Sequence, residues 1–494
     1  MMRRALKNLA VPLLGLLFAQ AIATVQVYSS NSELHRTLLV LKEAGYLIVP
    51  NQQILSILSD FKPAFWGGLF FTLTIGVFLT FLSWATAWAW NRLFSRNRLF
   101  LYFCLLAWLS SLILMNSQGL NFIVTLYFLI VPAMVFAAAS KLSNQEKGAP
   151  GYRSLLLLVP FLVLAGLWGT RADSDFFLNL RDRVLLSNPV GAKVNDFYYE
   201  YTFYPAETFK SLDQKLLKSC SIAGIQRKAD EQALEKTLIA HDYLPVDRAR
   251  YPVDLVVRED NGLLFFGHRE KSIVQTNLQE FLAGPGKVLE AFSHKTDTAS
   301  PFRAFILFSL LVSLPLVLYA VCFSLFFLIS SFVMSPKVSS WTASVLCLFL
   351  GSALFFYITG SATEESSDLA RALASDRWET RVAALKLIEQ KRLDVADFEP
   401  YPRLMRSPHA AERYWVARAL GFSKQTNAFK DLLGFLDDPS AGVVSMAFYA
   451  LGQRKDSRAV PEILKRIETS GSWYNQWYAY RALRNKGWKQ DRSR

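Results

Sequence analysis

A repeat near the C-terminus constrains the fold of this 494-residue chain more than any other feature. It is marked by leucines that follow one another at gaps of 33, 31 and 32 residues, namely Leu387, Leu420, Leu451 and Leu483. Four positions before each leucine stands a small apolar residue: Ala383, Val416, Ala447 and Ala479. A period in this range is typical of a solenoid of stacked helix pairs, which usually serves as a surface for other proteins. The sequence therefore predicts an interaction platform at the C-terminus.

Residues that begin and end helices recur in the same stretch. Leu436-Asp437-Asp438-Pro439-Ser440 is expected to open a helix, because Asp and Ser cap N-termini and Pro is tolerated at the first position. Gly421 and Gly452 follow Ala-Leu pairs and are expected to end helices. Together with Asp456–Leu464, this pattern resembles HEAT repeats, in particular the short bacterial type also found in phycobilin-lyase-like proteins. The resemblance covers about residues 364–490 and implies an α-solenoid; a plain helical bundle is the alternative.

The first and last copies of the repeat depart from the pattern. Lys386 and Ile388 stand where the middle copies have Ala and Gly, and Arg484 replaces Gly in the last copy. Such departures are expected of terminal repeats, because each must cover one open end of the array.

The rest of the chain is unusually apolar, with 52% hydrophobic and 14% aromatic residues. Six runs without a charge are near or above the length that spans a bilayer: Pro63–Trp90, Leu99–Met115, Leu120–Ser140, Ser154–Thr170, Ala304–Met334 and Val338–Thr363. A seventh run, Leu9–Tyr28, follows Arg3, Arg4 and Lys7. It is either an uncleaved anchor, which we favour because more apolar runs follow, or a signal peptide cleaved near Ala21 or Ala23.

The fold class predicted from these features is a polytopic α-helical membrane protein. It has about seven transmembrane helices, an α+β soluble insertion and a C-terminal α-solenoid of HEAT-like repeats. The expected domains are an N-terminal anchor (1–28), a short helical periplasmic segment (29–62), a four-helix transmembrane region (63–170), an α+β periplasmic domain (171–301), a transmembrane hairpin (302–363) and the repeat domain (364–490).

Basic residues predict the orientation. The loops Asn91–Arg98 and Lys141–Arg153 carry six Lys or Arg against one acid, Glu146, whereas Asn116–Asn121 carries none. The positive-inside rule predicts that the N-terminus and both basic loops are cytoplasmic. The soluble regions are then expected in the periplasm, on the outer side of a bacterial inner membrane. A re-entrant pair in the long run around Pro315 would instead leave the repeats in the cytoplasm.

The two soluble stretches before the repeats are expected to be structured. Residues 29–62 are predicted to form two short helices, either as a lid over the membrane helices or as a segment lying on the bilayer. Asp260-Asn261-Gly262 predicts a β-hairpin between Val253–Glu259 and Leu263–His268. The other predicted elements are helices at Asp173–Leu186, Ala206–Ser219, Ala229–Ala240 and Val274–Phe292. The aromatic stretch Asn195–Tyr204 either grips a glycan or lipid, or forms a domain core or a belt on the bilayer.

The sequence offers little support for catalysis. No catalytic residue, cofactor site or metal site is predicted, since the five His lack metal-binding spacing and no phosphate loop or nucleophile elbow occurs. His241-Asp242 and His268-Arg269-Glu270 are the clusters with acid–base potential, although the residues fit surface or capping roles better. Three of the four Cys lie in apolar runs, so no disulfide framework is expected.

The charge pattern narrows the classes of function. Most of the net charge of +14 is explained by cytoplasmic loops and a mildly basic repeat region, so no nucleic-acid partner is expected. The cores of the apolar runs lack ionisable residues, which argues against a self-sufficient ion-driven transporter.

Most of the residues that we expect to contact a partner lie in the last repeat. They are Trp473, Tyr474, Trp477, Tyr478 and Arg481, to which we add Arg413 of the second repeat, since aromatic residues and Arg concentrate at binding hot spots. The alternative is that the aromatics cover the open end of the array, by packing within it or on the neighbouring domain.

These observations predict a non-enzymatic scaffold or assembly subunit of a multiprotein envelope complex. Its expected partners are other membrane or periplasmic proteins and membrane lipid. One alternative is a subunit of an export or lipid/polysaccharide transport apparatus energised by a separate protein. Another is a membrane enzyme that acts on lipid or glycan through His241 or His268.

Overall fold

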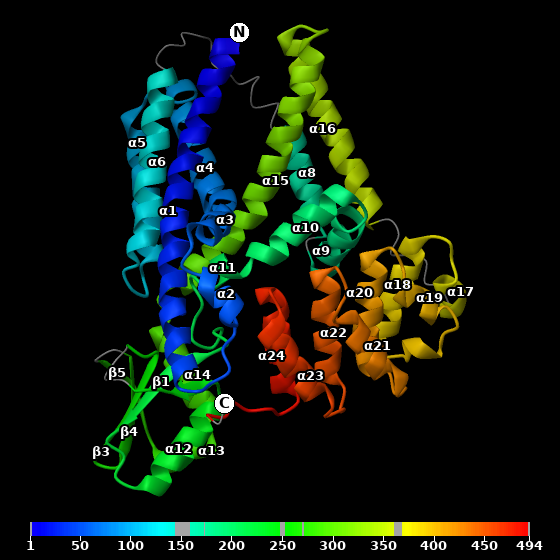
Figure 1. The fold of residues 1–494 in the computed structure, drawn as a ribbon. Helices are drawn as coiled ribbons and strands as arrows, with labels where there is room; N and C mark the ends of the chain where they lie inside the picture. Colours follow the sequence, from blue (N-terminus) through cyan, green and yellow to red (C-terminus); the bar gives the residue numbers. More distant parts are fainter. Residues whose placement is uncertain are drawn as a thin grey trace. The chain divides into compact units, whose positions relative to one another are not determined.

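A computed structural model describes residues 2–143, 159–171, 173–247, 252–268, 271–359 and 368–492 (Figure 1). The chain divides into two compact units, each assembled from three separate stretches. Unit 1 consists of Met1–Ser29, Phe61–Phe177 and Asp297–Thr359. Unit 2 consists of Ser30–Asp60, Leu178–Thr296 and Gly360–Arg494.

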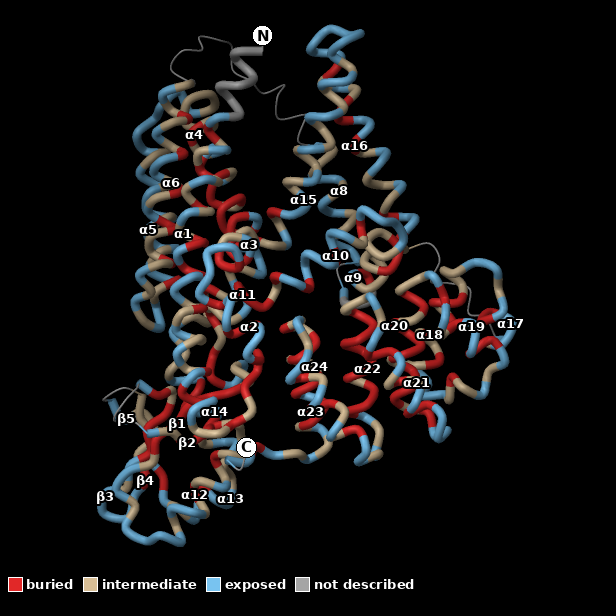
Figure 2. The backbone as a smooth tube through the Cα atoms, in the orientation of Figure 1, coloured by how far each residue is buried: buried red, intermediate tan, exposed pale blue. Residues whose placement is uncertain are grey.

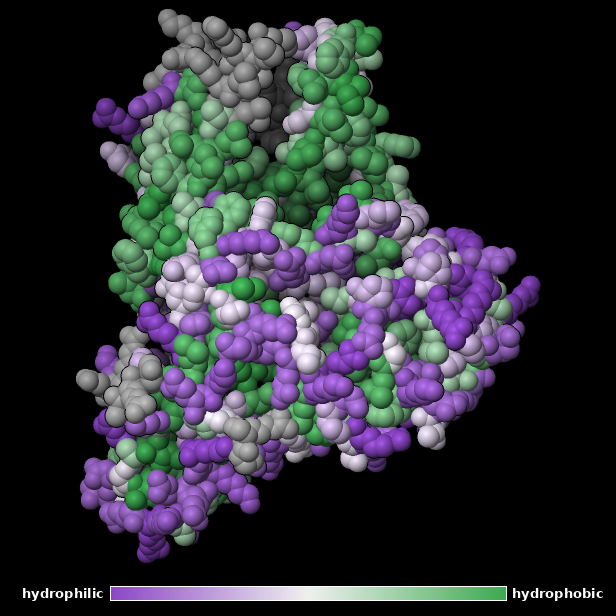
Figure 3. All heavy atoms as spheres, viewed as in Figure 1, coloured by the Kyte–Doolittle hydropathy of each residue, from purple (hydrophilic) through white to green (hydrophobic). Residues whose placement is uncertain are grey.

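Unit 1 is built from long apolar helices. They are α1 (Met2–Glu43, which continues into unit 2), α3 (Phe61–Phe71), α4 (Val77–Arg92), α5 (Arg98–Met115), α6 (Phe122–Ser143), α8 (Val159–Gly169), α15 (Ser300–Ser331) and α16 (Pro336–Thr359). A π-helical turn, η1 (Thr72–Gly76), joins α3 to α4. Hydrophobic residues cover much of the visible surface of these helices, drawn green in Figure 3.

Six helices among the described residues are long and apolar enough to cross a membrane. They correspond to six of the seven predicted apolar runs, since Phe61–Arg92 counts as one helix across the π turn. The remaining run, Ser154–Thr170, is described from Val159 onward, as α8. Lys147 and Arg153 of the second basic loop lie outside the described residues. The helix α15 continues through Pro315 without a break, so the re-entrant pair considered from the sequence does not form.

Small residues let α1 pack closely on α3 and η1. Ala19 and Ala23 are fully buried. A Cβ atom added at Gly68 would lie 3.0 Å from the backbone nitrogen of Thr24, and one at Gly76 would lie 2.6 Å from the Cβ of Ala19. Glycine at these two positions therefore permits a backbone approach that a larger residue would block.

Hydrogen bonds between polar side chains and backbone connect the same helices. Gln20 Nε2 donates to the carbonyl of Phe65 at 2.9 Å, and Thr72 Oγ1 donates to Gln20 Oε1 at 2.7 Å. In the π turn, the carbonyl of Thr74 accepts a hydrogen bond of 2.9 Å from Ser313 Oγ on α15. A π turn displaces carbonyls from regular helix bonding, and Ser313 satisfies one of them.

Unit 2 contains a five-stranded sheet within its described residues, in the order β2-β1-β3-β4-β5. The strands are β1 (Lys218–Ala223), β2 (Tyr243–Pro245), β3 (Leu255–Asp260), β4 (Leu263–His268) and β5 (Lys271–Asn277). β1 runs parallel to β2 and β3, and β3, β4 and β5 form an antiparallel meander. The helices α12 (Lys228–Ala240), α13 (Leu278–Ala283) and α14 (Pro285–Thr296) contribute Leu234, Leu238, Phe281, Leu289 and Phe292 to its core.

The predicted hairpin is confirmed. β3 and β4 flank a turn in which Asn261 and Gly262 have φ of 50° and 77°, the left-handed pair that a two-residue primed turn requires. The helix predicted at Ala229–Ala240 is also present, as α12.

The helix predicted at Ala206–Ser219 is wrong. Only Ala206 is helical, at the end of α11 (Phe203–Ala206), and β1 begins at Lys218. The partly buried carboxylate of Asp254 accepts hydrogen bonds from Lys215 Nζ at 2.8 Å and from the backbone N–H of Ser219 at 2.9 Å. These long-range bonds fix the chain at the start of β1, between β2 and β3, and override its local helical preference.

The predicted helix Val274–Phe292 is also wrong in its first part. That part forms β5, and two helices, α13 and α14, follow it. In residues 29–62, the first predicted helix is the end of α1, which stops before Gly45 at a φ of 84°. The second is α2 (Gln52–Ile57), capped by the side chain of Asn51.

The described part of the repeat region forms four helix pairs, coloured yellow to red in Figure 1. We call the first helices of the pairs A helices: α17 (Leu369–Leu373), α19 (Tyr401–Met405), α21 (Asn427–Phe435) and α23 (Ala459–Thr469). The B helices are α18 (Trp378–Gln390), α20 (Ala410–Ala419), α22 (Ala441–Gln453) and α24 (Trp473–Asn485). Consecutive B helices pack on one another, and buried residues gather along them, drawn red in Figure 2.

The first repeat is shifted by one residue from the predicted register. Ile388 is fully buried, like Leu420, whereas Leu387 is only partly buried. Arg381 donates to the carbonyl of Ser375, and Arg413 makes the same bond to Ser407, each at 2.6 Å and six positions back. The structural period between these two repeats is therefore 32 residues.

Glycine serves close helix packing at Gly452 and does not end the helix there. α22 continues to Gln453, contrary to the expectation from sequence. A Cβ atom at position 452 would lie 2.9 Å from the Cα of Ala482 on α24. At Gly434, on the exposed side of α21, an added Cβ would meet nothing within 4 Å.

We predict that Gly452→Ala destabilises unit 2, whereas Gly434→Ala does not. Overpacking costs about 1–3 kcal/mol, while replacing a helical Gly with Ala gains up to about 1 kcal/mol. Thermal unfolding of the purified protein should show a lower midpoint for Gly452→Ala and an equal or higher one for Gly434→Ala. Equal midpoints for both variants would contradict the close approach of α22 and α24.

Candidate functional site

One position repeats along the B helices and forms a row of mostly cationic side chains. Lys386, Arg418, Tyr449 and Arg481 follow one another at gaps of 32, 31 and 32 residues, so they occupy equivalent places on α18, α20, α22 and α24. We call these four residues the B-helix row. Aromatic residues of α20 and α24 flank it: Tyr414, Trp415, Tyr474, Trp477 and Tyr478.

A segment before the sheet covers the first part of the row. This segment includes the end of α9 (Ser174–Leu180) and the π-helical turn η3 (Arg181–Leu185). The carboxylate of Asp182 is 1% exposed; it accepts a hydrogen bond of 2.9 Å from Trp415 Nε1 and lies 3.0 Å from Lys386 Nζ. Lys386 also donates to the side-chain carbonyl of Asn179 at 2.8 Å. The row thus already holds one buried carboxylate.

A second cation completes the surroundings of Asp182. Arg181 lies 2.6 Å from that carboxylate, and its guanidinium stacks 3.9 Å from the ring centre of Tyr414. Burial opposes the charge of Arg181, but Asp182, Tyr414 and Tyr199 hold its pKa above the ordinary value. Burial lowers the pKa of Lys386, and Asp182 partly offsets this effect.

Aromatic side chains of α10 (Pro189–Tyr201) and α11 pack on the last repeat. The ring of Tyr199 lies 4.5 Å from that of Tyr474, between centroids. Phe203 lies 5.6 Å from Trp473 and 5.7 Å from Trp477, measured in the same way. The aromatic stretch of residues 195–204 therefore contributes to a domain core, one of the alternatives considered from the sequence.

The predicted partner-contact residues are not all in one place. Trp473 is 4% exposed, whereas Tyr474, Trp477 and Tyr478 are partly buried; all four belong to the aromatic layer between α24 and α10–α11 or its edge. Arg413 instead bridges two repeats, through an ion pair of 2.6 Å with Asp438. Arg481 is exposed, and its guanidinium lies 4.6 Å from the ring centre of Trp477.

The open end of the array is covered, as its terminal position requires. Asn51 Nδ2 donates to the carbonyl of Ile467 at 2.8 Å, and the backbone N–H of Asn51 donates to Gln476 Oε1 at 2.7 Å. On the sheet side, Tyr480 donates a hydrogen bond of 2.6 Å to Asp242. Segment 30–60 and the sheet domain therefore both contact the last repeat.

The second half of the row, Tyr449 and Arg481, and the neighbouring Arg418 are less covered on unit 2. Arg481 is exposed, and the other two are partly buried. We call these three residues the open half of the row. Arg418 pairs with Glu389 at 2.8 Å, and its guanidinium lies 5.2 Å and 5.7 Å from the ring centres of Trp415 and Tyr449. Within the part of the chain that the structure describes, Arg481 has no ion pair. These side chains form a surface on which planar cations stand beside aromatic rings.

Sequence reasoning missed several members of this site, among them Asp182, Lys386 and Tyr449. The repeat period was a signal for two of them, since Lys386 and Tyr449 stand one period from Arg418 in either direction. Nothing in the local sequence marks Asp182, which lies more than two hundred residues before its partners.

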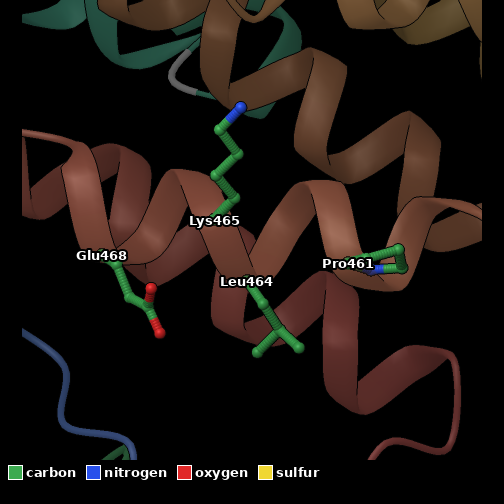
Figure 4. Close-up of a pocket in the computed structure, with 4 residues that line it drawn as sticks. All are labelled: Pro461, Leu464, Lys465 and Glu468. Atoms are coloured by element: carbon green, nitrogen blue, oxygen red, sulfur yellow. The ribbon is translucent and has the colours of Figure 1, made fainter.

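A shallow depression of about 490 Å³ lies on the A-helix side of the last repeat (Figure 4). Pro461, Leu464, Lys465 and Glu468 of α23 line it. Lys465 and Glu468 give it one charge of each sign, and Pro461 and Leu464 add small apolar surfaces, so its lining favours no particular class of ligand. It contains none of the predicted contact residues.

The two histidines of the enzyme hypothesis occupy structural positions. His241 follows the last residue of α12, and burial lowers its pKa. His268 ends β4, with Nδ1 3.0 Å from the carbonyl oxygen of Asp254. Across the described residues, no group of three or more His, Cys, Asp or Glu side chains is placed to hold a metal ion.

Comparison with known proteins identifies the array. Residues 400–484 match the sequence profile of the family described as HEAT repeats. The match covers the second, third and fourth helix pairs and stops short of the atypical first pair. No curated protein and no solved structure matches the chain.

We predict that Asp182→Asn loosens η3 and α10 from the array. The change removes the charge that faces Lys386 and Arg181, and the loss of a charged hydrogen-bond partner costs about 1.5–3 kcal/mol. Hydrogen exchange of backbone amides in residues 181–201 should therefore accelerate about 10- to 100-fold. Asp196→Asn, an equal change on the exposed side of α10, should leave exchange unchanged. Equal protection in both variants would show that Asp182 does not hold the segment.

Proposed function

We propose that this chain is an integral membrane scaffold subunit that assembles a multiprotein bacterial envelope complex. The observation that carries the proposal is the HEAT-repeat array, whose B-helix face combines arginines with aromatic rings and is only half covered by the chain itself. Surfaces of this composition are typical of protein–protein hot spots. Unit 1 anchors this platform in the bilayer and offers its apolar helices to lipid or to other subunits.

The connectivity of unit 2 supports seven membrane crossings. Its three stretches contact one another through Asn51 and Gln476 and through Asp182 and Trp415, which supports a common side of the membrane for all three. Three long apolar helices separate the first stretch from the second, and an odd number would place them on opposite sides. We infer that α8 is part of a fourth crossing, which restores an even number.

The hairpin of α15 and α16 supports a position of the array on the same side as the rest of unit 2. The helices α15 and α16 separate the second stretch of unit 2 from the third, and two crossings return the chain to the same side. Arg92 ends α4, and Arg96 and Arg98 follow it. The positive-inside rule then makes the C-terminal end of α4 cytoplasmic and the whole of unit 2 periplasmic.

The packing of α1 supports an anchor that stays on the protein. Removal of residues 1–23 would delete Gln20, so the carbonyl of Phe65 would lose its side-chain donor and Thr72 would keep only its longer hydrogen bond, of 3.3 Å, to the carbonyl of Gly68. It would also remove Ala19, which lies close to Gly76. Buried polar groups without partners are costly in an apolar environment.

We predict that the mature protein keeps residues 1–23. Intact-mass spectrometry of protein purified from membranes should give the mass of the chain with its N-terminal region. A mass lower by the residues up to Ala21 or Ala23 would show cleavage and contradict the role of Gln20 in unit 1.

We predict that cysteines in unit 2, and in the loop that follows α5 in unit 1, are reached from the periplasm. In a variant without the four native cysteines, Ser457→Cys on the array and Ser117→Cys after α5 should react with an impermeant maleimide in cells whose outer membrane is opened. Ser95→Cys, after α4, should react only after the inner membrane is lysed. Labelling of Ser95→Cys and protection of Ser457→Cys would reverse the proposed topology.

The scaffold function is tested by what remains bound to the chain. Purification in native nanodiscs through a C-terminal tag, followed by mass spectrometry, should recover other envelope proteins in stoichiometric amounts. A monodisperse chain without any stoichiometric partner would contradict the scaffold proposal. An unrelated membrane protein of similar abundance, tagged in the same way, provides the control.

A further inference from the structure

We propose that the open half of the B-helix row binds an acidic segment of a partner protein. The binding residues are Arg418, Tyr449 and Arg481, with Trp477 beside the last. This inference rests on the scaffold function proposed above and names the chemistry of its partner.

The first residue of the row, Lys386, shows what such a contact looks like. There Lys386 and the neighbouring Trp415 hold the carboxylate of Asp182, which is almost fully buried. At the other end of the row, aromatic side chains of α10 and α11 pack on the rings of α24. The open half lies along the same row, and a ligand there would extend an interface that already exists within unit 2.

The open half also has the chemistry to bind carboxylates. A guanidinium that stacks on an aromatic face keeps its N–H groups directed outward in the plane, where they match a carboxylate in a bidentate pair. Arg481 stacks in this way on Trp477, and Arg418 is placed between Trp415 and Tyr449. Glu389 neutralises only one of the two arginines.

The spacing of the row sets the spacing of the acidic residues in the partner. Packed helices lie about 8–10 Å apart, so Arg418 and Arg481, which are two helices apart, are separated by about 16–20 Å. An extended chain advances about 3.3–3.6 Å per residue. Two acidic residues that contact both arginines should therefore stand about five or six positions apart in an extended segment.

The test is a selection of displayed random 12-residue peptides on the full-length protein in nanodiscs. The expected result is enrichment of Asp or Glu at that spacing. Binding of the selected peptides should weaken at least tenfold in Arg481→Glu and in Arg418→Gln. Lys430→Glu, a charge reversal at an exposed position of α21, is the matched control and should leave binding unchanged. Hydrogen exchange of residues 181–201 reports whether each variant keeps the fold of unit 2.

Three results would overturn the proposal. They are no enrichment at all, selected peptides without an excess of acidic residues, and acidic peptides that bind Arg481→Glu and Lys430→Glu equally well. The scaffold function is judged separately, by native purification. Stoichiometric partners that remain bound to Arg481→Glu would support the scaffold function and contradict the acidic-segment proposal. Acidic peptides that bind a chain without native partners would support the acidic-segment proposal and contradict the scaffold function.

Discussion

The organisation of unit 2 depends on the contacts that the buried carboxylate of Asp182 makes with the repeat array. It joins the turn before α10 to two different B helices, through Lys386 on α18 and Trp415 on α20. The aromatic contacts of Tyr199 and Phe203 with α24 extend this attachment to the last repeat. Because of this attachment, the insertion and the array behave as one body, although the helical hairpin of α15 and α16 separates them in the chain.

An ion pair at this depth is better explained by specificity than by stability. Removing a carboxylate and an ammonium from water costs several kcal/mol per ion, and their attraction often does no more than offset that cost. The burial of large aromatic side chains supplies more of the binding free energy, at roughly 25 cal/mol per Å². Apolar contact alone, however, would let α10 slide along the array. The hydrogen bonds and ion pairs of Asp182 fix one register, which leaves the second half of the B-helix row uncovered.

The sequence predicted those features that local patterns encode. The repeat period, the apolar runs and the Asn261-Gly262 turn each require particular residues within one element, and the HEAT match, the six apolar helices and the hairpin agree with them. The predictions from sequence failed where contacts between distant residues determine the structure. The strand that begins at Lys218 depends on Asp254, and the attachment of η3 to the array depends on Asp182. The site was predicted in part, because the aromatic residues of α24 were visible as a cluster. Arg413 was assigned to the same site, but the stacking of the repeats places it in an ion pair between helices.

Photo-crosslinking from position 198 tests whether α10 lies against the last repeat. Tyr198 is 55% exposed and lies on α10 next to Tyr199, so a benzophenone side chain fits there without displacing the core. In the protein in native membranes, we predict an intramolecular crosslink to the peptide that contains residues 473–485. Crosslinks to lipid alone, or none to the array, would show that α10 does not lie on the last repeat.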